Sequence, residues 1–168
     1  MPLNLIKYYN NLLDFGAYNE HQRRQSIQAI FDRDFTNNPN LCFKNKPIQP
    51  TPKNGEIPMA TLFTHLTTVI IDPYTRQRTF ELDRTRRLHW IKYHIEENKK
   101  DEMLIFSVIE PEGVRTYIYD LIEKYVIVLE PLKKANEYYL LTAYYLRVKD
   151  AKRNKILQKY KRRLNELF

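Results

Sequence analysis

The chain has 168 residues, of which 43% are hydrophobic and 29% charged, enough for one well-buried core but not for two large domains. Its single cysteine excludes an internal disulfide, and its longest apolar runs fall far short of the roughly 20 residues that cross a membrane. The 28 Lys and Arg against 20 Asp and Glu leave a net charge of +8, which favours a polyanionic partner, although a merely solvated basic surface is an equal alternative. The start of the chain lacks the pattern of a secretory signal, so we expect a cytoplasmic protein that contacts no membrane.

Residues 1–35 are predicted to form an N-terminal helical segment. Apolar residues between Asn4 and Phe15 recur at spacings of three and four, which predicts a short helix that ends at Gly16. Asn19 is followed three residues later by Gln22, a pair typical of a capping box at the start of a second helix. That second helix should end before residue 37 and bury Ile27, Ile30 and Phe31.

Residues 36–58 separate this segment from the rest of the chain. They contain five prolines and no sustained hydrophobic period, and we interpret them as an extended linker or a long loop. The domain that follows, residues 59–168, opens with a stretch from Leu62 to Ile71 whose β-branched residues predict a strand near its end. Asp72 and Pro73 then predict a turn.

A helix is predicted next, capped by Asp83 and running to about Asn98. The 3.6-residue period places four residues on one stripe of this helix: Arg84, Leu88, Ile91 and Ile95. A charge on an apolar stripe is costly unless its head reaches a polar cleft, which makes Arg84 a candidate site residue; the alternative is an arginine whose head reaches water from a frayed helix start. His89 and Lys92 are neighbours on the same helix.

Four strands should follow, at Met103–Ile109, Val114–Asp120, Tyr125–Glu130 and Glu137–Val148. Their short connections indicate an antiparallel meander. In the last strand the period of two places Thr142 and Tyr144 on one face, suited to hydrogen-bond a phosphate oxygen. Tyr117 and Tyr119 are candidates for stacking unpaired bases, although tyrosines that simply fill a sheet face are an equal alternative.

The last segment, residues 150–168, is predicted to be a basic helix that packs by Ile156, Tyr160, Leu164 and Leu167. The predicted fold class is therefore α+β: N-terminal helices, then a helix followed by a four-stranded antiparallel β-meander and a C-terminal helix. The sequence contains no Gly-rich phosphate loop, no paired cysteines, no HExxH and no glycine-flanked serine. The four histidines have no metal-ligand spacing, so neither a metal nor another cofactor is predicted.

Several of these residues belong to short motifs that occur in a fixed order: Arg84-x-x-Arg87-Leu88-His89-Trp90-Ile91-Lys92, Thr116-Tyr117-Ile118, Tyr125-Val-Ile-Val-Leu129 and Leu141-Thr142-Ala143-Tyr144. Over residues 60–148 this order resembles a phage-associated nuclease family of the BECR superfamily, which includes barnase, EndoU, the tRNase colicins and RelE. The resemblance implies a metal-independent endoribonuclease, in which the ribose 2′-hydroxyl attacks the adjacent phosphate and leaves a cyclic phosphate. The implied partners are RNA, with tRNA as one candidate, and an antitoxin or immunity protein.

The resemblance also implies roles for individual residues, namely catalytic ones for Arg84, Arg87, His89, Lys92, Thr142 and Tyr144. His89 would move a proton, with His65 as the reserve candidate, while the cations would stabilise charge on the pentacoordinate phosphate. Thr142 or Tyr144 would hold the scissile phosphate. His65, Tyr117 and Tyr119 are the expected substrate-binding residues. The alternatives are a non-catalytic nucleic-acid-binding or phage structural protein on the same fold, and a protein-binding module that uses the C-terminal helix.

Overall fold

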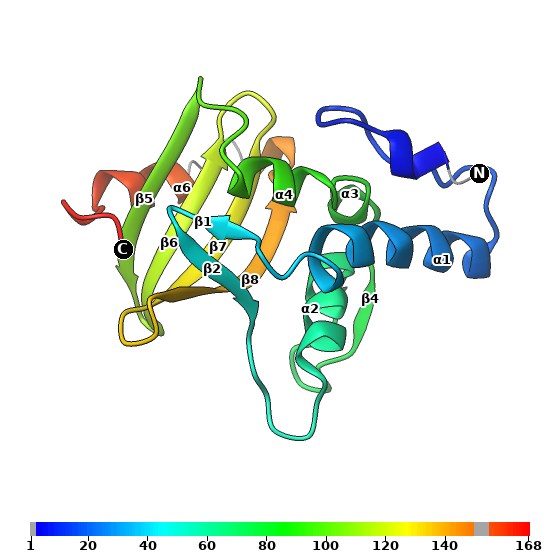
Figure 1. Cartoon of the computed structure of the whole chain (residues 1–168), viewed down its shortest axis with the longest axis horizontal. Coiled ribbons are helices and arrows are strands. Elements are labelled where there is room, and N and C mark those ends of the chain that lie inside the picture. The colour runs from blue at the N-terminus through cyan, green and yellow to red at the C-terminus, as the bar shows by residue number, and fades with distance from the viewer. Residues whose placement is uncertain (1–2, 150–154) are drawn as a thin grey trace.

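The computed structural model describes residues 3–149 and 155–168, which form a mixed α+β fold (Figure 1). Its helices are α1 (Glu20–Phe31), α2 (Pro58–Thr67), α3 (Leu82–Thr85), α4 (Trp90–Ile95) and α6 (Lys155–Lys161), with a 3-10 turn η1 (Leu3–Ile6) and a π-helical turn η2 (Asp32–Thr36). Its strands are β1 (Cys42–Phe43), β2 (Lys46–Pro50), β3 (Thr68–Ile70), β4 (Arg78–Phe80), β5 (Met103–Glu110), β6 (Gly113–Asp120), β7 (Tyr125–Leu132) and β8 (Glu137–Tyr145). Among the described residues, no helix is long and apolar enough to cross a membrane.

In the described chain six strands form the main sheet, in the order β1-β2-β8-β7-β6-β5, and β3 pairs with β4 in a separate hairpin. Strands β5 to β8 pair antiparallel in chain order, as their short connections predict. The predicted four-stranded sheet is nevertheless wrong in extent, because β2 adds to β8 in parallel and β1 folds back onto β2.

These two additional strands lie in residues 36–58, which were expected to be a linker or a loop. Strand β2 was not predicted because it contains two prolines, and proline has no backbone N–H and is rare inside a sheet. Here the pairing of β1 reaches only Lys46 and Pro47, so Pro50 lies beyond the part of β2 that β1 covers. A sheet position of this kind depends on partners about 90 residues away, Ile48 pairing with Tyr138, and no local pattern reports it.

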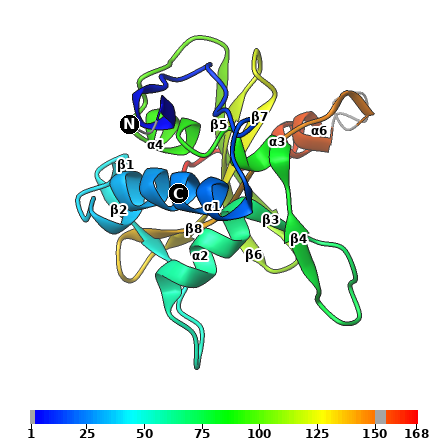
Figure 2. The same ribbon diagram turned by 90° about the vertical axis from the view of Figure 1, so that its right-hand side faces the viewer.

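The two faces of the main sheet carry different helices (Figure 2). One face packs against α1, α2 and α4 in the larger apolar cluster, which joins Ile30, Leu66 and Ile91 to Ile127 and Leu129. The other face carries Tyr117, Tyr119, Val126 and Val128, and α6 covers part of it through Ile156. Alternate residues of β6 and β7 therefore face opposite clusters, as the period of two requires.

The helix predicted between Asn4 and Phe15 is wrong, because only the turn η1 forms there. Contacts far along the chain replace the helical hydrogen bonds in this segment. The Asn4 amide bonds both the N–H and the carbonyl of Asp14, at 2.8 and 2.9 Å, and the Leu13 N–H donates to Arg86 O at 2.9 Å. Leu13 and Phe15 still reach the core, but from an irregular backbone.

A buried carboxylate at the end of β6 also holds this N-terminal segment in place. Asp120 is fully buried and accepts hydrogen bonds from the Tyr9 hydroxyl and from Lys99 Nζ, the latter at 2.6 Å, while His94 Nε2 lies 3.2 Å from it. Burial alone would raise the pKa of Asp120, but the nearby His94 and the hydrogen bonds from Lys99 and Tyr9 hold it well below its usual range. The network therefore joins residue 9 to the sheet as an ionised centre.

Helix α1 begins as predicted. Gln22 N donates to the Asn19 side chain at 2.9 Å, and Asn19 N donates to the Gln22 side chain at 3.0 Å, which completes the capping box. Ile27, Ile30 and Phe31 are buried. The local signal was sufficient because both partners of the cap lie within four residues.

The helix predicted from Asp83 to Asn98 is instead two short helices, α3 and α4, separated by a turn. Its N-cap is Glu81 rather than Asp83: the Glu81 carboxylate accepts from the N–H groups of Asp83 and Arg84 at 3.2 and 2.7 Å. Through the turn the N–H of Leu88 bonds three residues back, to Thr85 O, instead of four. Leu88, Ile91 and Ile95 are buried as predicted.

The predicted C-terminal helix is too long. Residues 150–154 lie outside the described chain, and the helix α6 ends at Lys161. Ile156 is buried as expected, but beyond α6 the backbone runs along the edge of β5, where Leu164 N donates to Ser107 O at 2.8 Å. The edge strand is thereby covered by the chain itself, which limits pairing with other molecules.

The capping box gives a stability prediction. Asn19→Ala removes the side-chain acceptor for Gln22 N, and we expect the free energy of unfolding to fall by about 1 kcal/mol. Urea denaturation followed by circular dichroism measures it. Gln25→Ala, an exposed change on the same helix, is the matched control and should stay within about 0.5 kcal/mol of the parent. Equal stability of the two variants would contradict the capping role.

Candidate functional site

Arg84 projects from α3 toward the end of α2 and the middle of β8. Its Nη1 donates to His65 O at 2.8 Å, to Thr68 O at 3.2 Å and to the Thr142 hydroxyl at 3.3 Å. The last carbonyls of a helix have no partners inside the helix, so a guanidinium beside them is favourable. Burial lowers the pKa of Arg84, with Glu81 opposing that shift, and the guanidinium remains charged.

A second guanidinium meets the first at the same carbonyl. Arg78, on β4, donates from Nε to the Thr68 hydroxyl at 2.8 Å and from Nη2 to Thr68 O at 3.1 Å. Burial, followed by the charge of Arg76, lowers the pKa of Arg78. Sequence reasoning missed Arg78, because only the pairing of β4 with β3 places it beside Thr68 and no local period reports that pairing.

His65 lies in the last turn of α2, half-buried beside these two arginines. Burial lowers its pKa first, and the positive charges of Arg78, Lys53 and Arg84 lower it further, against the opposing charge of Glu56. The imidazole is therefore neutral near pH 7 and can accept a proton. We call the group formed by His65, Arg78, Arg84 and Thr142 the arginine corner.

Thr142 reaches the arginine corner from β8 next to an irregularity in the strand. Val128 pairs with Thr142 and Leu129 with Leu140, so Leu141 is the extra residue of a β-bulge. A bulge redirects the side chains beside it, and here the Thr142 hydroxyl meets Arg84. Tyr144 follows two residues later, packs against the apolar cluster on the α6 side of the sheet, and its charge acts on the pKa of Arg84.

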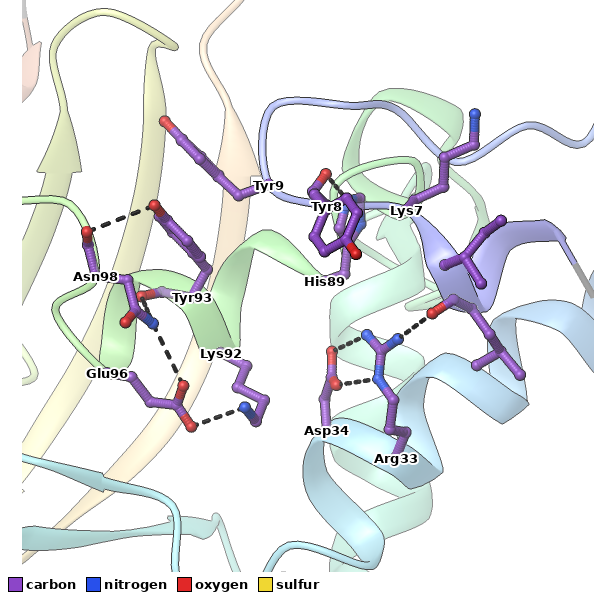
Figure 3. A pocket seen from close by; sticks show the side chains of 12 residues that line it. Lys7, Tyr8, Tyr9, Arg33, Asp34, His89, Lys92, Tyr93, Glu96 and Asn98 are labelled. Atoms are coloured by element: carbon purple, nitrogen blue, oxygen red, sulfur yellow. Dashed lines mark hydrogen bonds and ion pairs between the residues drawn. The ribbon is translucent and has the colours of Figure 1, made fainter.

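His89 and Lys92 lie apart from the arginine corner. They line a pocket of about 510 Å³ between the N-terminal segment, η2 and α4, with Tyr8, Arg33 and Tyr93 among its other lining residues (Figure 3). In the pocket Lys92 pairs with Glu96 at 2.8 Å and Arg33 pairs with Asp34 at 2.6 Å. The pairing of opposite charges leaves this pocket with no excess of positive charge from those residues.

His89 itself has a structural environment. It is 6% exposed, and its Nε2 donates to Tyr8 O at 3.0 Å. Burial lowers its pKa to about 4, although the hydrogen bond to Tyr8 opposes that shift. The catalytic roles implied for His89, Lys92, Arg84 and Thr142 require these residues to meet in one cleft. They do not meet, because the turn that ends α3 directs α4 toward the N-terminal segment.

Arg87 is also turned away from the arginine corner. It is 9% exposed, and its guanidinium lies over the Tyr145 ring at 3.9 Å and near the Trp90 ring at 5.3 Å. Its Nη1 donates to Asp83 O at 2.6 Å. The side chain therefore packs α3 against the end of β8 through cation–π contacts.

Tyr117 and Tyr119 are not placed to stack unpaired bases, which corrects the expectation from sequence. Each is 4% exposed and lies in the cluster that α6 covers. The Tyr117 hydroxyl donates to Glu110 at 3.0 Å and accepts from Lys159 Nζ at 2.9 Å, so the ring helps to fix α6 on the sheet. The alternation of apolar residues in β6 indicated a buried face. The partners of the Tyr117 hydroxyl, Glu110 and Lys159, could not be predicted from that pattern.

The chain was compared with family models, curated proteins and solved structures, and none of them matches it. Within residues 3–149 and 155–168, no group of three histidine, cysteine, aspartate or glutamate side chains is arranged to hold a metal ion. The arginine corner and the pocket that contains His89 are therefore judged by their own geometry.

The burial of His89 predicts a pH dependence of stability. Its folded pKa of about 4 lies below the ordinary 6.5, so between these values the unfolded chain binds more protons than the folded chain. The free energy of unfolding should therefore rise with pH across this window, by at most about 3 kcal/mol from this group. Denaturation across this pH range measures it.

His89→Gln keeps a donor for Tyr8 O but cannot titrate, and it should flatten the pH dependence. The remaining slope includes His65, whose pKa is lowered in the same direction. His21→Gln, at an exposed position on α1, is the matched control and should leave the slope unchanged. A His89→Gln profile parallel to that of the parent would show that the imidazole is not buried in neutral form.

Proposed function

We propose that the protein is a metal-independent endoribonuclease and that the scissile phosphate binds at the arginine corner. The observation that carries the proposal is that Arg84 meets Arg78 at one carbonyl and contacts Thr142 on a strand 58 residues further along the chain, beside a neutral imidazole. Cations can stabilise the charge that builds on the phosphate during RNA cleavage, and a proton acceptor can activate the 2′-hydroxyl.

Both arginines keep donors for a ligand. In the described chain, the three hydrogen bonds of the Arg84 side chain all come from Nη1, and those of Arg78 come from Nε and Nη2. A guanidinium has five N–H donors, so Nη2 of Arg84 and Nη1 of Arg78 are left for phosphate oxygens. The bonds to the backbone hold the guanidiniums in place before the substrate arrives, which is the preorganisation that electrostatic catalysis needs.

The proposed reaction uses His65 as the general base in place of His89. Neutral His65 takes the proton of the ribose 2′-hydroxyl, and the 2′-oxygen attacks phosphorus. The bond from phosphorus to the 5′-oxygen breaks, and the leaving oxygen takes a proton from protonated His65 or from water. Arg84 and Arg78 stabilise the charge on the pentacoordinate phosphate, while the Thr142 hydroxyl orients the phosphate.

A nucleic-acid-binding protein without turnover is the second candidate function. It is favoured by one observation: the six residues to which the family resemblance assigns catalysis do not meet in one cleft, since His89 and Lys92 line a separate pocket. Such a protein would bind RNA through the same arginines, with a salt dependence that reports the phosphates neutralised.

The test is cleavage of total RNA and of tRNA in EDTA, with the product ends identified. We expect 2′,3′-cyclic phosphate and 5′-hydroxyl ends. Loss of the base in His65→Gln should lower kcat/KM by about 10²- to 10⁴-fold, and Thr142→Val or Arg84→Lys by about 10²-fold or more. Because the pKa of His65 is lowered from 6.5, activity should rise with pH, with the midpoint of the rise below that value.

The matched control is His89→Gln, which changes a histidine outside the arginine corner and should keep the cleavage rate of the parent. Thermal melts of every variant separate loss of chemistry from loss of fold. Parent protein that binds RNA in a salt-dependent manner but leaves it intact would replace the nuclease by the second candidate. Equal losses in His65→Gln and His89→Gln would remove the assignment of the base.

A further inference from the structure

The β3–β4 hairpin projects from the body of the molecule beside α2 and is not part of the main sheet (Figure 2). Thr68 pairs with Phe80, and Ile70 pairs with Arg78. Between the strands, the Asp72 carboxylate accepts the Tyr74 N–H at 2.9 Å, and Asp72 O accepts the Arg76 N–H at 2.8 Å. The tip is therefore a hydrogen-bonded turn with a defined backbone, from which its side chains project.

The surface of this hairpin is unusually apolar for an exposed turn. Tyr74 is 95% exposed, and Ile71 and Ile70 are 55% and 37% exposed. A large aromatic ring held in water on an ordered turn gains nothing for folding, and exposed aromatics of this kind mark binding surfaces.

The charge of the hairpin favours an anionic partner. Between residues 68 and 80 the only acidic side chain is Asp72, whose carboxylate already accepts backbone N–H groups at the tip. The basic residues are Arg76, which is exposed at the tip, and Arg78, which belongs to the arginine corner. An aromatic ring flanked by arginines is the combination that binds unpaired bases and their phosphates.

The hairpin begins at the arginine corner. Thr68, the first residue of β3, provides the carbonyl that both Arg78 and Arg84 bind. A strand rises about 3.3 Å per residue, so the four residues from Arg78 back to Tyr74 span at most about 13 Å. A polynucleotide whose phosphate lies at the arginine corner can therefore extend along the hairpin to its tip.

We propose that the β3–β4 hairpin binds single-stranded RNA next to the cleaved bond, with Tyr74 stacking on an unpaired base and Arg76 binding a phosphate. This inference rests on the proposed function, because it places the substrate by the arginine corner. A single strand is favoured over a duplex because only an unpaired base exposes its face to a tyrosine ring. Ile70 and Ile71 would then contact the sugar and base edges beside the stacked ring.

The experiment compares a dinucleotide with a single-stranded RNA of about 12 nucleotides, a length within the usual range of single-strand binding sites. Tyr74→Ala should weaken binding of the longer RNA about tenfold, the loss expected for one base–aromatic stack, and lower kcat/KM on it to the same extent. Cleavage of the dinucleotide should not change, because it does not reach the tip. Binding is measured in the His65→Gln background, so that the RNA stays intact.

Three variants complete the design. Tyr74→Phe retains the ring and should bind within about twofold of the parent, since stacking needs the ring and not the hydroxyl. Arg76→Gly is tolerated by the backbone, because Arg76 has a φ of 62°, a conformation that glycine adopts readily. It should reduce the slope of log binding constant against log salt by about 0.7, the value for one phosphate of a single strand. Tyr8→Ala, at an 81% exposed tyrosine near the His89 pocket, is the matched control and should change nothing.

The outcomes separate the two proposals. The hairpin inference would be overturned, while the nuclease stands, if Tyr74→Ala lowered activity equally on the dinucleotide and the longer RNA. It would also be overturned if Tyr74→Ala lowered activity on neither substrate, and the apolar surface would then be assigned to a protein partner. If the parent cleaves neither substrate but its binding of the longer RNA depends on Tyr74, the hairpin inference stands and the nuclease falls. If Tyr74→Ala and Tyr8→Ala weaken RNA binding equally, the hairpin inference is also overturned.

Discussion

The partial burial of one positive charge organises the centre of this molecule. Arg84 leaves α3 at a position that the apolar period directs inward, and a guanidinium that loses part of its water is stable where acceptors replace that water. Those acceptors are the carbonyls of His65 and Thr68 at the end of α2, together with the hydroxyl of Thr142. One side chain thus fixes where α2 ends, where β3 begins and how both lie against β8.

The same contacts determine which chemistry the molecule can perform. Because backbone carbonyls hold Nη1 of Arg84 and Nη2 of Arg78, the remaining donors are fixed in direction without the cost of ordering a long side chain during binding. Burial is the largest cause that lowers the pKa of both histidines, and at His65 the positive charges of Arg78, Lys53 and Arg84 lower it further. Neutrality alone does not make a general base: His65 lies beside cations with free donors, while His89 donates to a backbone carbonyl.

Sequence reasoning succeeded where the determining contacts are local and failed where they are distant. The capping box of α1 and the alternation in β5 to β8 could be predicted, because each depends on residues a few positions apart. Helix α2 was not predicted although Pro58 stands in its first turn, because the β-branched residues at its end are typical of a strand. The segment around Tyr9 has a helical period, but its hydrogen bond to Asp120, 111 residues away, outweighs that local preference.

The candidate site shows the same division, for a reason that lies in helix geometry. Arg84 could be singled out from the sequence because a charge on an apolar stripe violates a rule, and the cost of that violation requires a partner elsewhere in the fold. The family resemblance grouped His89 and Lys92 with Arg84, and one continuous helix would have kept the three residues on neighbouring surfaces. The turn between α3 and α4 separates these residues. In this turn the Leu88 N–H bonds the carbonyl three residues back instead of four, which changes the direction of the chain. A period locates residues relative to one another only as far as the element continues, so the partners of Arg84 had to come from α2, β4 and β8 instead.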